Sequence, residues 1–528
     1  MLGRAFHQSS DCSITKPHPL RKTVSTMPPE TTNPLGNIEH VVVLMLENRS
    51  FDNVLGWLYD PNNKPPFQTP PRNQTFNGVS GTALSNPAVS GEMIPVGSTP
   101  DTTNPYPDPG EIYQDVYGQM YNVYPLPADI PSDPPQPPLM QGFVINYTYQ
   151  KDVTDPANIM NGFRPPALPT VSQLANSFVV CDNWFASVPS QTLTNRSFMH
   201  AGTASGYVNN DLHDLPIFIN DTPTIFNLME AQKVSWRIYY GSYWFLSMAF
   251  LNQKQLERYV FDFGPKRFFP FQQFLDDAKK GTLPTYSFIE PNFMDSLNPL
   301  YGRENDMHPD AAILDWDHKP SDAIFGDELV RKIYQALLAS PLWNKTLLVI
   351  IFDEHGGTYD HVPPGPATPP DNRIIKKGDP GYSGFQFNRY GVRVPAIMVS
   401  PLLVAGTVDH TLYDHTSVLR TVMQQFGVTG DLGQRVANAN LITPQLASPP
   451  RADVPAFPNP VIEDEAVAVT VDAPPTAIQS TLIQAAALRL SQLGGATPDP
   501  AKLAMRLTAE AELLRLAKSV GLGNPQPS

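Results

Sequence analysis

Residues 40–56 read HVVVLMLENRSFDNVLG, and this stretch decides the fold. Its apolar run, 41–46, passes directly into Glu47 and Asn48. Residues 347–354, LLVIIFDE, repeat the pattern, because the apolar run 347–352 is followed at once by Asp353 and Glu354. Runs of this length that are apolar on both faces are typical of strands in a sheet covered by helices on both sides.

The remaining chain alternates in the same way. Four more short apolar runs are candidate strands: 178–181, 234–240, 286–289 and 394–399. Helical spacing of apolar residues marks 322–340 and 416–426, and Gly427 is a candidate cap for the second helix. Strands alternating with helices predict an α/β sandwich with a mostly parallel central sheet flanked by helices.

Proline sets the expected domain organisation. The chain holds 58 prolines, and 18 of them lie between Pro61 and Pro138, so we interpret 61–140 as a Pro-rich insertion after the first strand of one large domain. The chain is expected to consist of a tail over 1–34, the domain over 35–445, a linker over 446–475 and a helical tail over 476–528. Within the helical tail, helices are expected near 476–493 and 499–520.

Composition excludes several classes. The surplus of 50 acidic over 36 basic residues gives a net charge of −14, which argues against a nucleic-acid partner. Two cysteines cannot build a disulfide scaffold or a four-cysteine zinc site. Apolar runs are too short for a transmembrane segment, and the N-terminal residues lack the apolar core of a secretory signal, so the default expectation is a cytoplasmic protein.

The acidic pairs predict a metal site. In open α/β sheets ligands bind beyond the carboxyl ends of the strands, so Glu47, Asn48, Asp353 and Glu354 are expected in one crevice. Three carboxylates would repel one another there unless a cation neutralised them. Oxygen ligands suit Mg²⁺, Ca²⁺ or Mn²⁺, while nearby histidines leave Zn²⁺ or Fe open. The alternative is that both strand ends are polar only because they leave the core.

Residues 181–206 offer a nucleophile. The hydroxyl groups are those of Ser187, Ser190, Thr192 and Thr194, followed by the polar donors Asn195 and Arg196. A hydroxyl needs activation, and a metal supplies one route. A guanidinium such as that of Arg196 stabilises charge on a phosphoryl or carboxyl substrate. The alternative is a loop whose Ser and Thr side chains bond only to its own backbone.

The histidines of interest in the C-terminal half are His308, His355, His361, His410 and His415. His308 lies in a loop sequence, NDMHPD, where a packed core histidine is less expected. His355 and His361 follow the second acidic pair, where Gly356 and Gly357 permit a tight turn. His415 stands at the head of a predicted helix, where a structural role is as good an interpretation as a catalytic one.

Five segments, in order along the chain, carry a family resemblance: 40–56, VPSQTLTNRSF (188–198), NDMHPD (305–310), IFDEHGGTYDHVPP (351–364) and YDHTSVLRTVMQQFG (413–427). Over about residues 38–430 the chain resembles the bacterial phosphoesterase family, which contains the phospholipases C of the non-zinc type and the acid phosphatase A enzymes and extends to plant non-specific phospholipases C. The resemblance implies a fold similar to alkaline phosphatase and hydrolysis of phosphoric esters by a metal-bound hydroxyl nucleophile. Members of that family are often exported.

Roles follow from the resemblance residue by residue. It implies one divalent metal held by Glu47, Asn48, Asp353 and Glu354, with Thr192 as nucleophile and further metal ligand. His308 is expected near the phosphate or leaving group, with Arg196 stabilising charge and His308 or His361 as the base toward water. The candidate substrate-binding residues are Asn195, Glu111 and His355.

The chain departs from the family pattern in three places. The nucleophile loop usually reads G-P-T-x-P-N-R, whereas residues 190–196 read SQTLTNR and lack both prolines. A family histidine usually follows D-P-G, but here Asp108-Pro109-Gly110 is followed by Glu111, which predicts weaker phosphate binding or altered leaving-group preference. The β-rich C-terminal domains of the larger haemolytic phospholipases have no counterpart.

Three functions stay open at this point. Phospholipase C-like cleavage of a phosphodiester needs an apolar approach, which the tyrosines of the insertion could provide unless they merely pin a long loop: Tyr106, Tyr113, Tyr117, Tyr121 and Tyr124. Acid phosphatase activity on monoesters needs more positive charge, and Glu111 argues against it. A non-catalytic binding protein is the third alternative, and the metal, head group and oligomeric state are not readable.

Overall fold

The two stretches that end in acidic pairs form the centre of the molecule's main sheet. Strand β1 (His40–Leu46) pairs in parallel with β10 (Thr346–Phe352), and the register places Leu46 opposite Phe352. On its other side β1 pairs in parallel with β9 (Tyr286–Glu290). Both central strands are buried along almost their whole length, as their unbroken apolar runs require.

The computed structural model describes residues 33–127, 137–210, 222–241, 266–293, 304–309, 321–373 and 382–457, with isolated positions at 130–131, 134, 377 and between 483 and 516. The whole of 33–528 groups as one compact unit. Most of the two predicted C-terminal helices and the predicted tail over 1–32 lie outside the described residues. The short helix α13 (Pro500–Leu503) falls within the second of those helices.

Eight strands make the main sheet, in the order β12-β6-β11-β10-β1-β9-β7-β8. The strands not yet given are β6 (Val179–Cys181), β7 (Trp236–Tyr240), β8 (Phe268–Pro270), β11 (Ala396–Val399) and β12 (Thr407–Asp409). Every neighbouring pair is parallel except those that β11 makes with β10 and β6. All six predicted strands are present, so the prediction of a mostly parallel α/β sandwich is confirmed.

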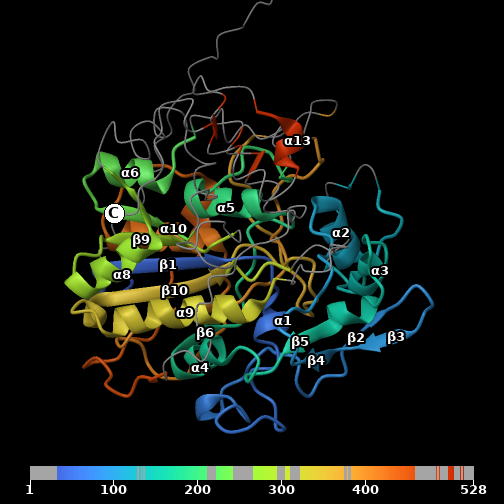
Figure 1. Ribbon diagram of the computed structural model, residues 1–528, viewed down its shortest axis with the longest axis horizontal. Helices are drawn as coiled ribbons and strands as arrows, with labels where there is room; N and C mark the ends of the chain where they lie inside the picture. The colour runs from blue at the N-terminus through green and yellow to red at the C-terminus, as the bar shows by residue number, and fades with distance from the viewer. Residues whose placement is uncertain are drawn as a thin grey trace, which may run out of the picture. The chain divides into compact units, whose positions relative to one another are not determined.

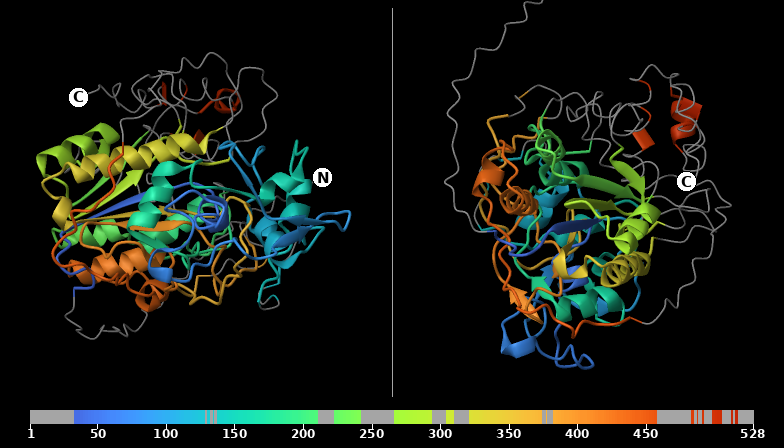
Figure 2. Two further views of the ribbon diagram at one scale, coloured as in Figure 1. Left: turned by 90° about the horizontal axis from the view of Figure 1, so that it is seen from below. Right: turned by 90° about the vertical axis from the view of Figure 1, so that its left-hand side faces the viewer.

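Helices cover both faces of this sheet. Figure 2 shows α8 (Phe271–Lys280) and α9 (Ala323–Leu338) on one face and α10 (His415–Gln425) on the other. Helix α4 (Pro169–Ser177) packs on α9, and α5 (Thr192–Ala201) packs between α10 and α6 (Ile225–Ala231). Both predicted helices, 322–340 and 416–426, are confirmed by α9 and α10, and Gly427 follows α10 in the left-handed conformation with φ 65°.

The Pro-rich insertion has structure of its own. Its elements and those that pack beside it gather at the end of the sheet where β1 runs into α1 (Figure 1). They are α1 (Phe51–Val54), the 3₁₀ turn Pro71–Asn73, β2 (Ser85–Pro87), β3 (Met93–Pro95), β4 (Gly97–Thr99), α2 (Tyr113–Tyr121), α3 (Phe143–Thr148), the 3₁₀ turn Pro156–Met160 and β5 (Asn161–Phe163). Elsewhere lie the 3₁₀ turn Trp343–Lys345 and α11 (Gln434–Asn438).

A second apolar cluster, separate from the sheet's core, explains the tyrosines. Tyr113, Tyr117 and Tyr121 are buried on α2, where they pack with Phe143 and other side chains of this cluster. They therefore pin the insertion, and the idea that these three line an apolar approach is wrong. Tyr124 alone among the described side chains of that tyrosine set is strongly exposed, and it stacks on Tyr149 with ring centroids 3.7 Å apart. No helix of the described chain is long and apolar enough to cross a bilayer.

Candidate active site

Three neighbouring strands deliver carboxylates to the same edge of the sheet. Glu47 and Asn48 follow β1, Asp353 and Glu354 follow β10, and Glu290 is the last residue of β9. The backbone N–H of Asn48 donates to Asp353 Oδ1 at 3.1 Å, which ties the two predicted acidic pairs together. All five side chains are fully buried. The prediction that the two pairs share one site therefore agrees with the geometry.

The turn after β10 is shaped by close backbone approach. Gly356 has φ 56°, and a Cβ there would lie 2.0 Å from the backbone oxygen of Asn48. Its N–H donates to Glu354 Oε2 at 2.8 Å. Asn48 itself has φ 49°, a conformation that asparagine tolerates better than most residues. The glycine thus allows the β10 turn to hold Glu354 against Asn48.

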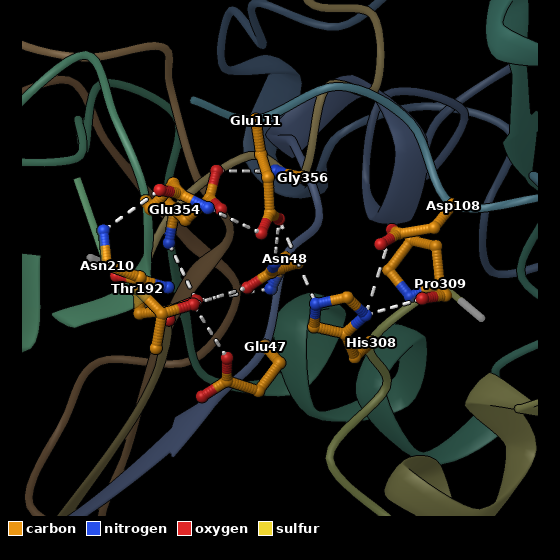
Figure 3. A network of polar contacts seen from close by, with 12 residues as sticks. Glu47, Asn48, Asp108, Glu111, Thr192, Asn210, His308, Pro309, Glu354 and Gly356 are labelled. Atoms are coloured by element: carbon orange, nitrogen blue, oxygen red, sulfur yellow. Dashed lines mark hydrogen bonds and ion pairs between the residues drawn. The ribbon is translucent and has the colours of Figure 1, made fainter. Parts of the chain in front are cut away.

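Thr192 is the first residue of α5, and its hydroxyl points at the strand ends. Its Oγ1 lies 3.2 Å from Glu47 Oε2 and 3.3 Å from Asn48 Oδ1 (Figure 3). The other hydroxyls of that loop bond elsewhere: Ser187 to Asp414, Ser190 to the carbonyl of Val208, and Thr194 to the carbonyl of Tyr207. Of the four candidate nucleophiles, Thr192 is the one whose hydroxyl meets the acidic pairs.

Asn195 explains how the nucleophile loop holds its shape without the two prolines. Its amide nitrogen donates to the carbonyls of Val188, Ser190 and Gln191, and its Oδ1 accepts from the N–H of Val188 at 2.9 Å. Asn210 adds a bond from the N–H of Leu193 at 2.9 Å. The carboxamide of Asn195 is thus used on the loop, and its substrate-binding role stays a prediction.

Arg196 is buried among the carboxylates. Its guanidinium donates to Glu47, to Glu290 at 2.7 Å and to the carbonyl of Met45, and its Nε lies 3.6 Å from Asp353 Oδ2. Burial alone would lower the pKa of Arg196, but the neighbouring carboxylates reverse this and raise it. Removing one partner of such a buried network costs about 3–5 kcal/mol. The contacts make Arg196 a residue that positions Glu47.

One arginine does not balance this site. Burial, followed by repulsion from neighbouring carboxylates, raises the pKa of Glu354 and of Glu111 well above the ordinary range. Burial also raises the pKa of Glu47, against the opposing effect of Arg196 and with the help of Asp353. A site that makes ionised carboxylates unfavourable lacks positive charge, which a cation would supply.

The donor set fits a hard divalent cation. Among the described residues, Asp353 Oδ2 and Glu354 Oε1 are buried oxygens that accept no hydrogen bond, although Asp353 Oδ2 faces Arg196. With Glu47, Asn48 and the Thr192 hydroxyl they offer only oxygen ligands. Two His-containing groups of the described chain also bring ligand atoms within 4.8 Å of one another: Asp108, Glu111 and His308 beside this site, and Asp52, Asp360 and His361 away from it.

Glu111 and His308 complete the site from the insertion side. Glu111 accepts hydrogen bonds from the side-chain amides of Asn48 and, at 3.2 Å, of Gln191 (Figure 3). His308 Nε2 lies 3.8 Å from Glu111 Oε2, and His308 Nδ1 contacts the carbonyl of Pro309 and lies 3.8 Å from Asp108. Both side chains are buried. The predicted grouping of Thr192, Glu111 and His308 is therefore present in the geometry.

Of the other two predicted histidines, His355 lies beside the acidic pairs and His361 lies in the cluster with Asp52 and Asp360. His355 Nε2 is 2.9 Å from Gln119 Oε1 and its Nδ1 is 3.4 Å from Glu354, and burial lowers its pKa to about 3, so it is a neutral neighbour of the site. His361 belongs to the other cluster, where its Nδ1 is 2.6 Å from Asp52 Oδ2. No contact within the described part of the chain joins His361 to Thr192, and its role as base stays a prediction.

Several site residues escaped the sequence analysis. Glu290 ends a predicted strand just as Glu47 and Asp353 follow theirs, so the same rule would have found it. His415 Nε2 lies 2.6 Å from the backbone oxygen of Asp353, which agrees with a structural role. Gln191 and Asn210 had no sequence signal, because their contribution depends on which loop lies beside them.

Comparison with known proteins gives a consistent picture. The sequence profile described as the Phosphoesterase family matches residues 38–429. Non-specific phospholipase C5 of Arabidopsis thaliana is 35% identical over 440 residues, which cover 80% of this chain and 77% of that protein. Phospholipase C B of Mycobacterium tuberculosis is 27% identical over 466 residues, covering 80% of this chain and 81% of that protein.

The solved structures that align with this fold include a protein of the alkaline phosphatase superfamily from Vibrio parahaemolyticus. That alignment covers 52% of this chain and 64% of the other, with 14% identity and a TM-score of 0.29.

Proposed function

The chain belongs to the Phosphoesterase family and is a phosphoester hydrolase, and from this premise we propose that it cleaves phosphodiesters in the manner of a phospholipase C, with Thr192 as nucleophile and a divalent cation in the site. The relatives named above, which are phospholipases C, support the substrate class. The observation that carries the proposal is the Thr192 hydroxyl, 3.2 Å from Glu47 Oε2 and 3.3 Å from Asn48 Oδ1 at the start of α5.

The first step transfers the phosphoryl group to the protein. Thr192 Oγ1 attacks phosphorus, its proton passes to Glu47 Oε2, and a phosphorus–Oγ1 bond forms as the bond to the glycerol oxygen breaks. His308, protonated and held by Asp108, gives its proton to that leaving oxygen. Because Thr192 is the first residue of α5, the negative charge develops at a helix N-terminus, which stabilises it.

The second step releases the head group. His308, now neutral, accepts a proton from a water molecule, whose oxygen attacks the phosphothreonine. The phosphorus–Oγ1 bond breaks, and Thr192 recovers its proton from Glu47. Both steps leave every group as it began, with one water consumed and one phosphoester bond cleaved.

Glu47, Asn48, Asp353 and Glu354 would hold the cation, beside the Thr192 hydroxyl. A divalent cation there supplies the positive charge that lowers the pKa of a neighbouring hydroxyl and neutralises phosphoryl oxygens. Arg196 keeps Glu47 and Asp353 in place, and the buried core behind them excludes water.

The test compares Thr192→Ala, Thr192→Ser and Thr194→Ala. Thr192→Ala should lose at least about a thousandfold in kcat on p-nitrophenylphosphorylcholine, since no nucleophile remains, while Thr192→Ser keeps part of the activity. Thr194→Ala is the matched control, because it removes a hydroxyl two residues along the same helix, and it should stay active. All variants should unfold at similar urea concentrations.

Two outcomes would overturn the proposal. Full activity of Thr192→Ala would remove threonine as the nucleophile. A wild-type protein with a higher kcat/KM on p-nitrophenyl phosphate than on the phosphodiester would reverse the substrate class in favour of a phosphomonoesterase.

A further inference from the structure

Glu111 places a carboxylate where the resembled family usually has a histidine, directly after Asp108-Pro109-Gly110. It lies on the insertion just before α2, and it is 5% exposed. Gly110 allows this approach, since a Cβ on it would lie 2.6 Å from the carboxyl carbon of Asp115. The insertion therefore contributes a carboxyl group to the site rather than an imidazole ring, and the cation of the proposed function would favour its ionised form.

The carboxylate occupies two hydrogen-bond donors beside the nucleophile. Asn48 donates its side-chain N–H to Glu111 Oε2 while its own Oδ1 accepts from the Thr192 hydroxyl. Gln191, the residue before Thr192, donates its side-chain N–H to Glu111 Oε1 at 3.2 Å. One N–H of each amide is thus used on Glu111 and is not available to an oxygen of the phosphoryl group.

The two classes of phosphoester respond differently to such a carboxylate. A phosphodiester carries one negative charge over two unsubstituted oxygens. A phosphomonoester carries close to two charges at neutral pH over three oxygens, because its second pKa is near 6. An added carboxylate repels the dianion more strongly, and the loss of two donors harms the ester that has more charged oxygens to satisfy.

The surroundings of Glu111 do not cancel this effect. Arg196 is the cation that contacts the strand-end carboxylates, and its guanidinium is engaged by Glu47, Glu290 and the carbonyl of Met45. His308, when protonated, offsets part of the charge of Glu111, but its Nε2 lies 3.8 Å from Oε2, which is longer than a hydrogen bond. Added negative charge near Thr192 therefore acts on the substrate.

We propose that Glu111 is the residue that selects phosphodiesters against phosphomonoesters at this site, by its charge and by occupying the side-chain amides of Asn48 and Gln191. The inference rests on the proposed function, whose reaction and nucleophile it keeps.

Two substitutions separate the two effects. Glu111→Gln removes the charge but keeps an acceptor for one amide, and Glu111→Ala removes the charge and releases both amides. The measured quantity is the ratio of kcat/KM on p-nitrophenyl phosphate to kcat/KM on p-nitrophenylphosphorylcholine. We expect the ratio to rise by about tenfold or more in Glu111→Gln and further in Glu111→Ala.

The matched control is Glu92→Gln, which makes the same change of charge at an exposed position of the same insertion. Its ratio should equal that of the wild type. An unchanged ratio in Glu111→Gln and Glu111→Ala, with both proteins folded and active, overturns the proposal. So does a fall in the ratio.

A second measurement covers the case in which turnover is lost in both variants. Competition with a fluorescent phosphate analogue gives the affinity of inorganic phosphate relative to dimethyl phosphate in each folded variant. Tighter relative binding of inorganic phosphate in Glu111→Gln supports the assignment, and equal relative binding overturns it. Failure of this inference can be told apart from failure of the proposed function, because it is measured as a change in a ratio between variants. The proposed function fails instead if the wild-type protein does not cleave the diester or if Thr192→Ala keeps full activity.

Discussion

His200 shows how one residue on the nucleophile helix couples stability to pH. It lies eight residues, or about two turns, after Thr192 on α5, and its ring packs on Phe226 and Phe288 with centroids 5.2 and 4.7 Å away. Burial, and after it the positive charge of Arg196, lowers the pKa of His200 to about 3. The ring is therefore neutral in the folded protein at pH values above about 3.

We predict that His200→Gln weakens the pH dependence of stability on the acid side. Below pH 6.5 the unfolded chain binds a proton at His200 that the folded protein refuses, so the free energy of unfolding falls as the pH falls from about 6.5 toward 3. The contribution reaches about 1.4 kcal/mol per pH unit. Urea unfolding of both proteins at pH 7 and pH 5 should show a loss in the wild type that exceeds the loss in the variant by about 2 kcal/mol. Equal losses would contradict it.

The sequence predicted which residues of this loop belong to the site, but it did not predict which groups their side chains contact. The motif containing Thr192, Asn195 and Arg196 predicts a nucleophile followed by two polar groups for the substrate. In the fold the Thr192 hydroxyl and the Arg196 guanidinium both meet the acidic pairs, but Arg196 is bound by the buried carboxylates of Glu47 and Glu290. Asn195 turns back to its own loop. The carboxylates that bind the Arg196 guanidinium lie 94 and 149 residues away in the sequence. Spacing within the motif carries no information on these partners.

At the scale of elements, the turn that follows β10 depends on the close approach of the Gly356 backbone to the Asn48 backbone. Gly356 and Gly427 both have positive φ, 56° and 65°. A Cβ at Gly356 would lie 2.0 Å from the backbone oxygen of Asn48, whereas no atom lies within 4 Å of a Cβ at Gly427. Both glycines adopt a backbone conformation that strains other residues, but only Gly356 lacks room for a Cβ atom. Comparing alanine at the two positions therefore separates the effect of the close approach from that of backbone strain.

We predict different outcomes for alanine at these two glycines. Gly427→Ala should cost about 1–2 kcal/mol, the cost of left-handed backbone alone, and leave activity intact. Gly356→Ala should cost more, since the β10 turn must move away from Asn48, and a shift of about 1 Å at the site should lower kcat by about a hundredfold. Urea unfolding and kinetics on the phosphodiester measure both. Equal behaviour of the two variants would show that the close approach is not needed.

The strands and helices that sequence could predict are those with long apolar signals. β1 and β10 were readable because both of their faces are buried, which leaves unbroken apolar runs. β8 and β12 are three residues each and have too few side chains for a period to show. The antiparallel direction of β11 was not readable, since a buried strand has the same composition in either direction. The separate apolar core of the insertion was not predicted either, because its helices and strands are too short to show a clear periodicity.

At the scale of the molecule, the distribution of charge matters more than the net charge of −14. Many of the described acidic residues are buried, and five buried carboxyl groups gather near Arg196 and Thr192: Glu47, Glu111, Glu290, Asp353 and Glu354. The convergence of the two acidic pairs was predictable from where parallel strands end. Glu111 was expected at the site only through the family resemblance, because no pattern in the local sequence shows that the insertion passes over the strand ends.

We predict that this charge distribution makes both stability and activity depend on a divalent cation. Dialysis against EDTA should abolish cleavage of the phosphodiester and lower the free energy of unfolding, because the buried carboxylates then repel one another. Adding back Ca²⁺, Mg²⁺, Mn²⁺ or Zn²⁺ should restore both for the ion that fits, by about 2.7 kcal/mol at a free concentration of one hundred times Kd. Asp353→Asn/Glu354→Gln is the matched control: it removes two charges, so its stability should respond neither to EDTA nor to added cation. A wild-type protein that keeps activity and stability in EDTA, with no metal found by elemental analysis, would show that Arg196 and protonated carboxyl groups balance the site by themselves.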